Sequence, residues 1–228
     1  MNYFTADIHF CDESTMRSDN RPFKSVKEYD KFTIKHWNKL AKAGDTIYVV
    51  GDLLDCDGPD STEWIQGLRL IKKVKADIIL IIGNNEQRLI KFHFNNDFDA
   101  FAKFCKEYGI KEVYKDLDVE IKGKKVHLVH QIKDGKKNRL NLFGHTHLCS
   151  GVYHPYGLCI SCDLNHFRLF TEEILMGYLE RKAKYWEPDE NCNYINPFLK
   201  EVDGKVINIK QQKNVAYQNY LKCNNFEE

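Results

Sequence analysis

The chain contains 228 residues, which is enough for one large domain or for one domain with an extension. Hydrophobic residues make up 43% of the chain and charged residues 29%, so a wholly disordered protein is excluded. The 34 basic residues are balanced by 33 acidic ones, and the net charge of +1 argues against a surface built to bind duplex nucleic acid.

No segment of the sequence has the pattern of a membrane span or an export signal. The longest apolar runs, such as residues 78–82, are far shorter than the roughly 20 residues that cross a bilayer. We therefore expect no membrane partner and a cytosolic location, in which the eight cysteines stay reduced. Cys159 and Cys162 are closely spaced, but without a second such pair they predict buried apolar side chains rather than half of a zinc site or a redox pair.

Strands and helices alternate in the first half of the chain. Apolar runs predict three strands, over residues 3–8, 46–50 and 78–82. Apolar residues at three- and four-residue steps predict three helices, which begin after Ser25, after Ser61 or Thr62, and at residue 98. Ser25 and Glu28 form a capping box, in which each side chain satisfies a main-chain amide at the helix start.

The second half of the chain changes to hairpins. Two strand pairs are predicted, over residues 118–121 with 124–130 and over 152–154 with 158–163, together with a strand over 140–143 and a helix from 171 to about 184. Strand–helix units followed by hairpins indicate an α/β (α+β) fold of two mixed sheets flanked by helices. We predict one domain over residues 1–184 and a C-terminal extension over 185–228, which carries a hairpin over 198–209.

Polar side chains follow five predicted strands at their carboxyl ends. They are Asp7, His9, Asp52, Asn84, His130, His145 and His147. Ligands of open α/β sheets collect at this edge, and oxygen and nitrogen donors without a thiolate suit a pair of divalent metal ions. In two-metal hydrolases such ions activate a bridging water and hold the phosphoryl oxygens. The glycines that precede Asp52, Asn84 and His145 predict tight turns and close backbone approach.

This order of motifs resembles the calcineurin-like metallophosphoesterase superfamily, in particular its small phosphoesterases from bacteria and phages. The resemblance covers about residues 1–180 and includes the stretch Arg21-Pro22-Phe23. It implies a four-layer α/β/β/α sandwich with a dinuclear metal centre at one edge, and it assigns the ligands of that centre. One metal would be held by Asp7, His9 and His147. The other would be held by Asn84, His130 and His145. Asp52 would bridge the two metals, and Asp55 would orient a ligand from the second shell.

The sequence departs from the family pattern at Asn85, where the usual residue is a histidine that is thought to protonate the leaving group or to steady the transition state. An amide donates a hydrogen bond but does not deliver a proton near pH 7. Asn85 is therefore a candidate for catalysis and for substrate binding, with the general-acid step in doubt. Arg21 and Arg139 are further candidates for contacting substrate phosphate, although each also fits a solvated surface position. His127 is predicted to be exposed or structural.

We expect a metal-dependent phosphoesterase with two divalent ions, of which manganese is the first choice and nickel, iron(II) and zinc are alternatives. Phosphodiesters are favoured, because a monoester dianion binds the metals tightly both as substrate and as product. The expected substrate is a small, nucleotide-derived phosphate ester, and a homodimer that uses the C-terminal extension is one option. Two other functions stay open: a non-catalytic binding protein of the same fold, and a nuclease that acts on single strands.

Overall fold

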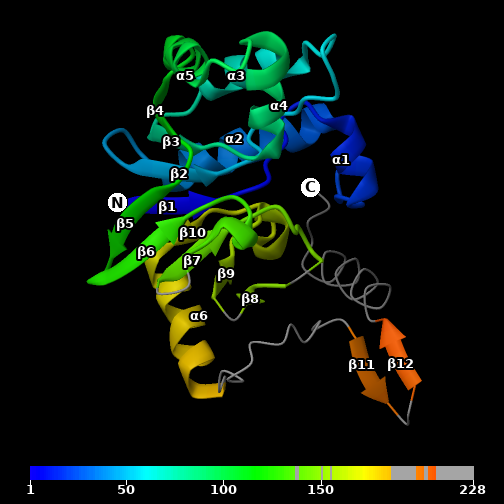
Figure 1. Ribbon diagram of the computed structural model, residues 1–228, viewed down its shortest axis with the longest axis vertical. Helices are drawn as coiled ribbons and strands as arrows, with labels where there is room; N and C mark the ends of the chain where they lie inside the picture. The colour runs from blue at the N-terminus through cyan, green and yellow to red at the C-terminus, as the bar shows by residue number, and fades with distance from the viewer. Residues whose placement is uncertain (137–138, 150, 155, 186–198, 203–204, 209–228) are drawn as a thin grey trace.

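Two five-stranded sheets lie face to face in the computed structural model, which describes residues 1–136, 139–149, 151–154, 156–185, 199–202 and 205–208 (Figure 1). The first sheet has the strand order β10-β1-β2-β3-β4. Four of its strands are parallel, namely β1 (Asn2–Thr5), β2 (Thr46–Val50), β3 (Asp77–Ile81) and β4 (Ile110–Tyr114). The fifth, β10 (Phe170–Thr171), pairs antiparallel with β1.

The second sheet has the strand order β5-β6-β7-β9-β8. Its central strands are parallel, namely β6 (Lys124–Leu128), β7 (Leu140–Phe143) and β9 (Gly157–Cys159). The edge strands β5 (Leu117–Ile121) and β8 (Tyr153–His154) are antiparallel to their neighbours. The predicted α/β fold of two mixed sheets flanked by helices is therefore confirmed.

Four helices cover the outer face of the first sheet, namely α2 (Val26–Leu40), α3 (Glu63–Ile71), α4 (Asn84–His93) and α5 (Phe98–Glu107). The side chains of β2 alternate between two cores: Ile47 and Val49 pack toward these helices, and Val50 packs between the sheets. Full burial of such a side chain stabilises the fold by about 1.5–3 kcal/mol. α6 (Glu172–Tyr185) flanks the second sheet, with Leu175 in the core between the sheets.

Several elements were not predicted from the sequence. The stretch after the first strand contains α1 (Glu13–Ser18), and the chain also forms α4, β4, β10 and the 3₁₀ turns η1 (Ile132–Asp134) and η2 (Cys162–Asn165). The first strand is shorter than predicted and ends at Thr5, because Asp7 takes a left-handed conformation with φ of 59°.

The predicted cap of α2 forms with one change of partner. Ser25 Oγ accepts a hydrogen bond from the Glu28 amide at 3.2 Å, as the capping box requires. The Glu28 carboxylate, however, accepts from the amide of Lys24 at 2.8 Å, one residue before the expected donor. α3 begins after Thr62, and no side chain caps it.

The C-terminal part of the chain forms the predicted hairpin. β11 (Leu199–Val202) and β12 (Lys205–Asn208) pair antiparallel, and the residues of the turn lie outside the described ones. Within the described ranges no helix has both the length and the apolar composition that a bilayer span requires. Cys159 and Cys162 are buried, as predicted.

Candidate metal centre

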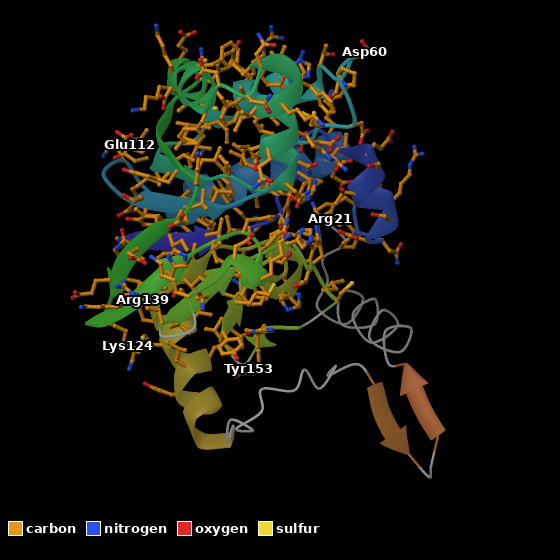
Figure 2. The ribbon with its side chains drawn as sticks, viewed as in Figure 1. Arg21, Asp60, Glu112, Lys124, Arg139 and Tyr153 are labelled. Atoms are coloured by element: carbon orange, nitrogen blue, oxygen red, sulfur yellow. The ribbon has the colours of Figure 1, made fainter. Side chains whose placement is uncertain are left out.

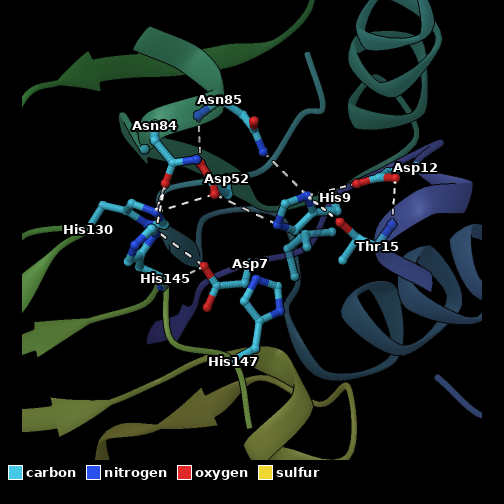
Figure 3. Close-up of polar contacts among 12 residues, drawn as sticks. Asp7, His9, Asp12, Thr15, Asp52, Asn84, Asn85, His130, His145 and His147 are labelled. Atoms are coloured by element: carbon cyan, nitrogen blue, oxygen red, sulfur yellow. Dashed lines mark hydrogen bonds and ion pairs between the residues drawn. The ribbon is translucent and has the colours of Figure 1, made fainter. Parts of the chain in front are cut away.

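The predicted metal ligands meet where the parallel strands end (Figure 3). The loops after β1 and β2 run side by side, since the amides of Asp7 and His9 donate to the carbonyls of Gly51 and Asp52 at 3.0 and 2.9 Å. The segments after β6 and β7 bring the histidines of the second sheet to the same place. The arrangement divides into two groups of side chains with Asp52 between them.

The first group consists of Asp7, His9 and His147, whose potential ligand atoms all lie within 4.8 Å of one another. Asp7 and His9 are buried. Asp7 Oδ1 accepts the amide of His145 at 2.8 Å, but Asp7 Oδ2 and His9 Nε2 have no hydrogen-bond partner among the described residues. Unsatisfied polar atoms of this kind are rare in protein interiors, and a cation between them would satisfy both.

The second group consists of Asn84, His130 and His145, and Asp52 lies close to both of its histidines. His130 Nδ1 lies 3.0 Å from the carbonyl oxygen of Val50, so this nitrogen carries the proton in the neutral ring. His130 Nε2 then points its lone pair at two further acceptors, Asn84 Oδ1 at 3.0 Å and Asp52 Oδ2 at 3.3 Å. Acceptors that face one another need a cation or a proton between them, and imidazole, amide and carboxylate donors suit a divalent metal.

Asp52 lies between the two groups. Its Oδ2 is 3.3 Å from His130 Nε2 and 3.7 Å from His9 Nε2, and its Oδ1 accepts the amide of Asn85 at 2.9 Å. Burial alone would raise the pKa of Asp52, but the hydrogen bond and the charge of His130 lower it to about 2. An ionised carboxylate in this position is suited to contact two cations at once.

Asp12 is a supporting residue that the sequence analysis missed. His9 Nδ1 donates to Asp12 Oδ2 at 3.0 Å, which fixes the ring and leaves Nε2 facing the centre. Asp55 was predicted to orient a ligand. Its carboxylate lies within 4.8 Å of potential ligand atoms of His9 and Asp12. Asp12, however, and not Asp55, accepts the hydrogen bond from His9. Burial, and then the charge of Asp12, raise the pKa of Asp55 to about 6.

Glu86 connects the loops after β2 and β3, a role that was not predicted from the sequence. Its fully buried carboxylate accepts the amides of Asp52, Leu54 and Gly83 at 2.9, 3.0 and 2.7 Å. Burial, and then the charge of Asp52, raise the pKa of Glu86 to about 7, while the amides favour its ionised form. This contact places Asp52 against the start of α4, where Asn84 and Asn85 lie.

The predicted close approach of the backbone is confirmed at the glycines before the ligands. A Cβ atom on Gly51 would overlap the ring of His130, and one on Gly83 would overlap the carboxylate of Asp52. A Cβ atom on Gly144 would lie 2.8 Å from Asp7 Oδ1. The site therefore has no room for a side chain at these positions.

The backbone of the candidate ligands is strained. Positive φ angles between 45° and 69° occur at Asp7, His9, Asp52, His145 and His147. Such angles are uncommon outside glycine, cost about 1–3 kcal/mol each, and collect at functional sites. The surrounding contacts must hold these residues in place against that strain.

Asn85 and Arg88 lie one helical turn apart on α4 beside the first group. Asn85 Nδ2 is 3.4 Å from His9 Nδ1, and Arg88 Nη1 is 3.4 Å from Asn85 Oδ1 and from the carbonyl of Cys56. Arg88 is exposed and makes no ion pair with a carboxylate in the described part of the chain. Arg88 was not predicted from the sequence, because a single arginine on a helix carries no motif.

The structure gives other partners to the two arginines selected as substrate contacts. Arg21 is buried, and Asp163 and main-chain carbonyls bind its guanidinium. Arg139 pairs with Asp118 at 3.0 Å, and in the view of Figure 2 it lies on the other side of the molecule from Arg21. Asp118 also binds His127 at 2.8 Å. His127 is buried, so of the two predictions for it, exposed or structural, the structural one fits. Neither arginine offers a free guanidinium to a phosphate at the centre.

Two proteins of similar sequence match parts of the chain. An uncharacterized protein of Methanocaldococcus jannaschii is 30% identical over 90 residues, which cover 40% of this chain and 49% of that protein. The symmetrical bis(5'-nucleosyl)-tetraphosphatase of Wigglesworthia glossinidia brevipalpis is 28% identical over 120 residues, which cover 53% of this chain and 35% of that protein. The matched part thus spans less than half the length of either relative.

A solved structure and a family model cover more of the chain. A protein of unknown function from Aquifex aeolicus superposes with a TM-score of 0.53 at 21% identity, covering 78% of this chain and 98% of that one, which shows a shared fold. The model of the calcineurin-like phosphoesterases matches residues 3–207, a range that includes both sheets and every candidate ligand. This chain belongs to the calcineurin-like phosphoesterase family.

Proposed function

We propose that this protein hydrolyses phosphodiesters at the centre formed by the two groups, with a divalent cation bound to each. The position of Asp52 carries the proposal: one carboxylate oxygen lies between His9 and His130, as a bridging ligand requires. When bound, the two cations would supply an activated water and would neutralise charge on the phosphoryl oxygens.

Manganese is the first choice of metal. The donors are carboxylate, amide and imidazole groups without a thiolate, a set that suits borderline to hard divalent ions. Nickel, iron(II) and zinc bind the same donors and are the alternatives. Asp12 would hold His9 in the tautomer that ligates, and the Val50 carbonyl would do the same for His130.

Asn85 and Arg88 are the proposed contacts for substrate phosphate. Asn85 is buried beside His9, and its amide nitrogen is able to donate to a phosphoryl oxygen. Arg88 brings an exposed guanidinium to the same side of the site, where it is able to pair with a non-bridging oxygen. We expect both residues to act by binding and orientation.

A dependence on good leaving groups follows from Asn85, and the preference for diesters follows separately from the charge of the substrate. General acid catalysis contributes about 10²–10⁴-fold to such reactions, and an amide does not supply it. The enzyme should therefore depend on good leaving groups. A diester also carries less charge than a monoester dianion, so it and its product are released more easily from two cations.

Nucleotide-derived diesters are the proposed substrate class. The Wigglesworthia relative is a bis(5'-nucleosyl)-tetraphosphatase, and it matches 53% of this chain. A substrate of this kind would present phosphate to the cations and to Arg88. The near-neutral charge of the chain fits a small substrate better than a long nucleic acid.

Metal analysis followed by two generic substrates tests the proposal. Purified protein loaded with Mn²⁺ should bind two metal ions per chain and should cleave bis(p-nitrophenyl) phosphate with a higher kcat/KM than p-nitrophenyl phosphate. Absence of bound metal and of turnover with Mn²⁺, Ni²⁺, Fe²⁺ and Zn²⁺ would overturn the hydrolase. A higher kcat/KM for the monoester would overturn the diester preference alone.

A further inference from the structure

Arg21, labelled in Figure 2, is buried, and most of the N–H groups of its guanidinium are hydrogen-bonded. Nε and Nη2 donate to the two carboxylate oxygens of Asp163, each at 3.0 Å. Nη1 donates to the carbonyl of Ile8 at 2.9 Å, and Nη2 also donates to the carbonyl of Asp7 at 2.7 Å. These contacts take four of the five N–H groups of the guanidinium. The rings of Tyr29 and Phe167 cover it at 4.9 and 5.6 Å.

The two carbonyls that bind Arg21 belong to the segment that carries Asp7 and His9. Both residues have left-handed φ angles, 59° and 54°, and such a conformation persists only where surrounding contacts enforce it. Tyr29 adds a second hydrogen bond to the Ile8 carbonyl at 2.6 Å. Arg21 therefore fixes the main chain that sets the direction of both side chains.

Asp163 extends the contact of Arg21 to the third member of the group. Asp163 Oδ2, which binds Arg21, also lies 3.2 Å from His147 Nδ1. A carboxylate that accepts from Nδ1 holds the ring of a histidine and leaves Nε2 for a metal. Asp19 approaches the same nitrogen at 2.7 Å, so His147 has two acidic neighbours on the side of Nδ1.

We propose that Arg21 is a positioning residue for one metal only, because it braces Asp7 and His9 through the main chain and His147 through Asp163. The inference rests on the proposed metal centre. None of the four hydrogen bonds ends on Asp52, His130 or His145. Arg21 is linked to the second group indirectly, through the Asp7 carboxylate that accepts the His145 amide at 2.8 Å. Loss of the brace should therefore reduce the affinity for the ion of the first group much more than the affinity for the other ion.

Conservative variants test this inference, since removal of a whole side chain from a buried ion pair endangers the fold. Arg21→Lys keeps the charge, but a single ammonium does not span the carboxylate and both carbonyls. Asp163→Asn keeps the shape and loses the charge-assisted bonds to Arg21 and His147. Tyr3→Phe is the matched control, because it removes the hydrogen bond of a buried tyrosine to a main-chain carbonyl, that of Leu40, and none of the contacts of Arg21.

Stepwise Mn²⁺ titration, followed by calorimetry and electron paramagnetic resonance, measures the two ions separately. We expect the wild type and Tyr3→Phe to bind two ions and to show a spin-coupled pair. In Arg21→Lys and Asp163→Asn, the affinity for one ion should fall about 10–100-fold and an isolated Mn²⁺ signal should replace the coupled one at intermediate metal concentration. The double variant should lose little more affinity for that ion than either single variant, because both changes break the same chain of contacts.

The possible outcomes separate the two proposals. A wild type that binds no Mn²⁺ overturns the metal centre and this inference with it. Unchanged affinity for both ions in folded Arg21→Lys and Asp163→Asn would overturn the inference and leave the proposed function standing. An equal loss of affinity for both ions, or the same loss in Tyr3→Phe, would show a general loss of structure and would also overturn the brace.

Discussion

Replacement of Asp52 by asparagine removes one charge from the centre while it preserves the shape of the side chain. The remaining carbonyl oxygen is still able to accept the Asn85 amide, which now binds Oδ1 at 2.9 Å. The main-chain amide of Asp52 keeps its bond to Glu86 at 2.9 Å. The variant should therefore fold, and the change should act on the contacts of Oδ2, which lies between His9 and His130.

The expected loss is large because Asp52 is buried and faces both groups. Removal of one member of a buried charge pair typically costs about 3–5 kcal/mol. We expect a loss of the same size in the transition state, where Asp52 would face both cations. Each 1.36 kcal/mol corresponds to a factor of ten in rate, so kcat/KM of Asp52→Asn should fall by about 10²–10⁴-fold. Affinity for both metal ions should fall together, in contrast to the selective loss expected for Arg21→Lys.

The assay is hydrolysis of bis(p-nitrophenyl) phosphate at saturating Mn²⁺, with metal content and melting temperature measured on the same samples. Asp118→Asn is the control, because Asp118 is also a carboxylate bound to a histidine, His127 at 2.8 Å, but contacts none of the candidate ligands. It should leave turnover unchanged. Turnover of Asp52→Asn within threefold of the wild type at saturating metal would refute the bridging assignment.

Three further predictions concern the substrate side and the stability of the fold. Asn85→His should restore a general acid, so the rate of cleavage of alkyl diesters should rise toward that of aryl diesters. The pH–rate profile should also gain an ionisation near neutral pH. Similar aryl and alkyl rates in the wild type would contradict the reasoning. Arg88→Ala should raise KM for diesters about tenfold with little change in kcat, and Arg88→Lys should recover part of the loss; unchanged kinetics of both would exclude a phosphate contact. Burial raises the pKa of Asp30 to about 6, so the folded state binds more protons than the unfolded state between about pH 4 and 6 and loses about 3 kcal/mol of stability as pH rises through that window. Asp30→Asn should therefore stabilise the protein at pH 8 and change little near pH 4 in urea unfolding, and an equal effect at both pH values would show that the ionisation is not the cause.

The sequence predicted those elements that have a strong local pattern. β2 and β3 are continuous apolar runs, and α2 combines a cap at Ser25 with apolar residues on one face. The elements that were not predicted lack such a pattern. β10 has two residues, and the buried face of α4 begins with the polar residues Asn85 and Glu86, whose burial is decided by contacts with other loops.

The set of candidate ligands was also visible in the sequence, because each residue directly follows a strand. Parallel strands end at the same edge, so residues far apart in the chain are expected to meet there. Asp12 left a weaker signal, three residues after His9. Glu86 directly follows Asn85 in the sequence, but no pattern there indicated that its carboxylate binds the loop of Asp52.

Only the tertiary structure decided what Arg21 and Asp163 do. They are 142 residues apart, and neither has a local pattern that separates a surface arginine from a buried one. Their pairing depends on β10 and η2 returning to the side of β1, which brings Asp163 to Arg21 and to His147. Local sequence thus determined which groups are available for binding metal. Long-range packing determined which charges support them, since an ion pair in the interior forms only after the fold has excluded water from both partners.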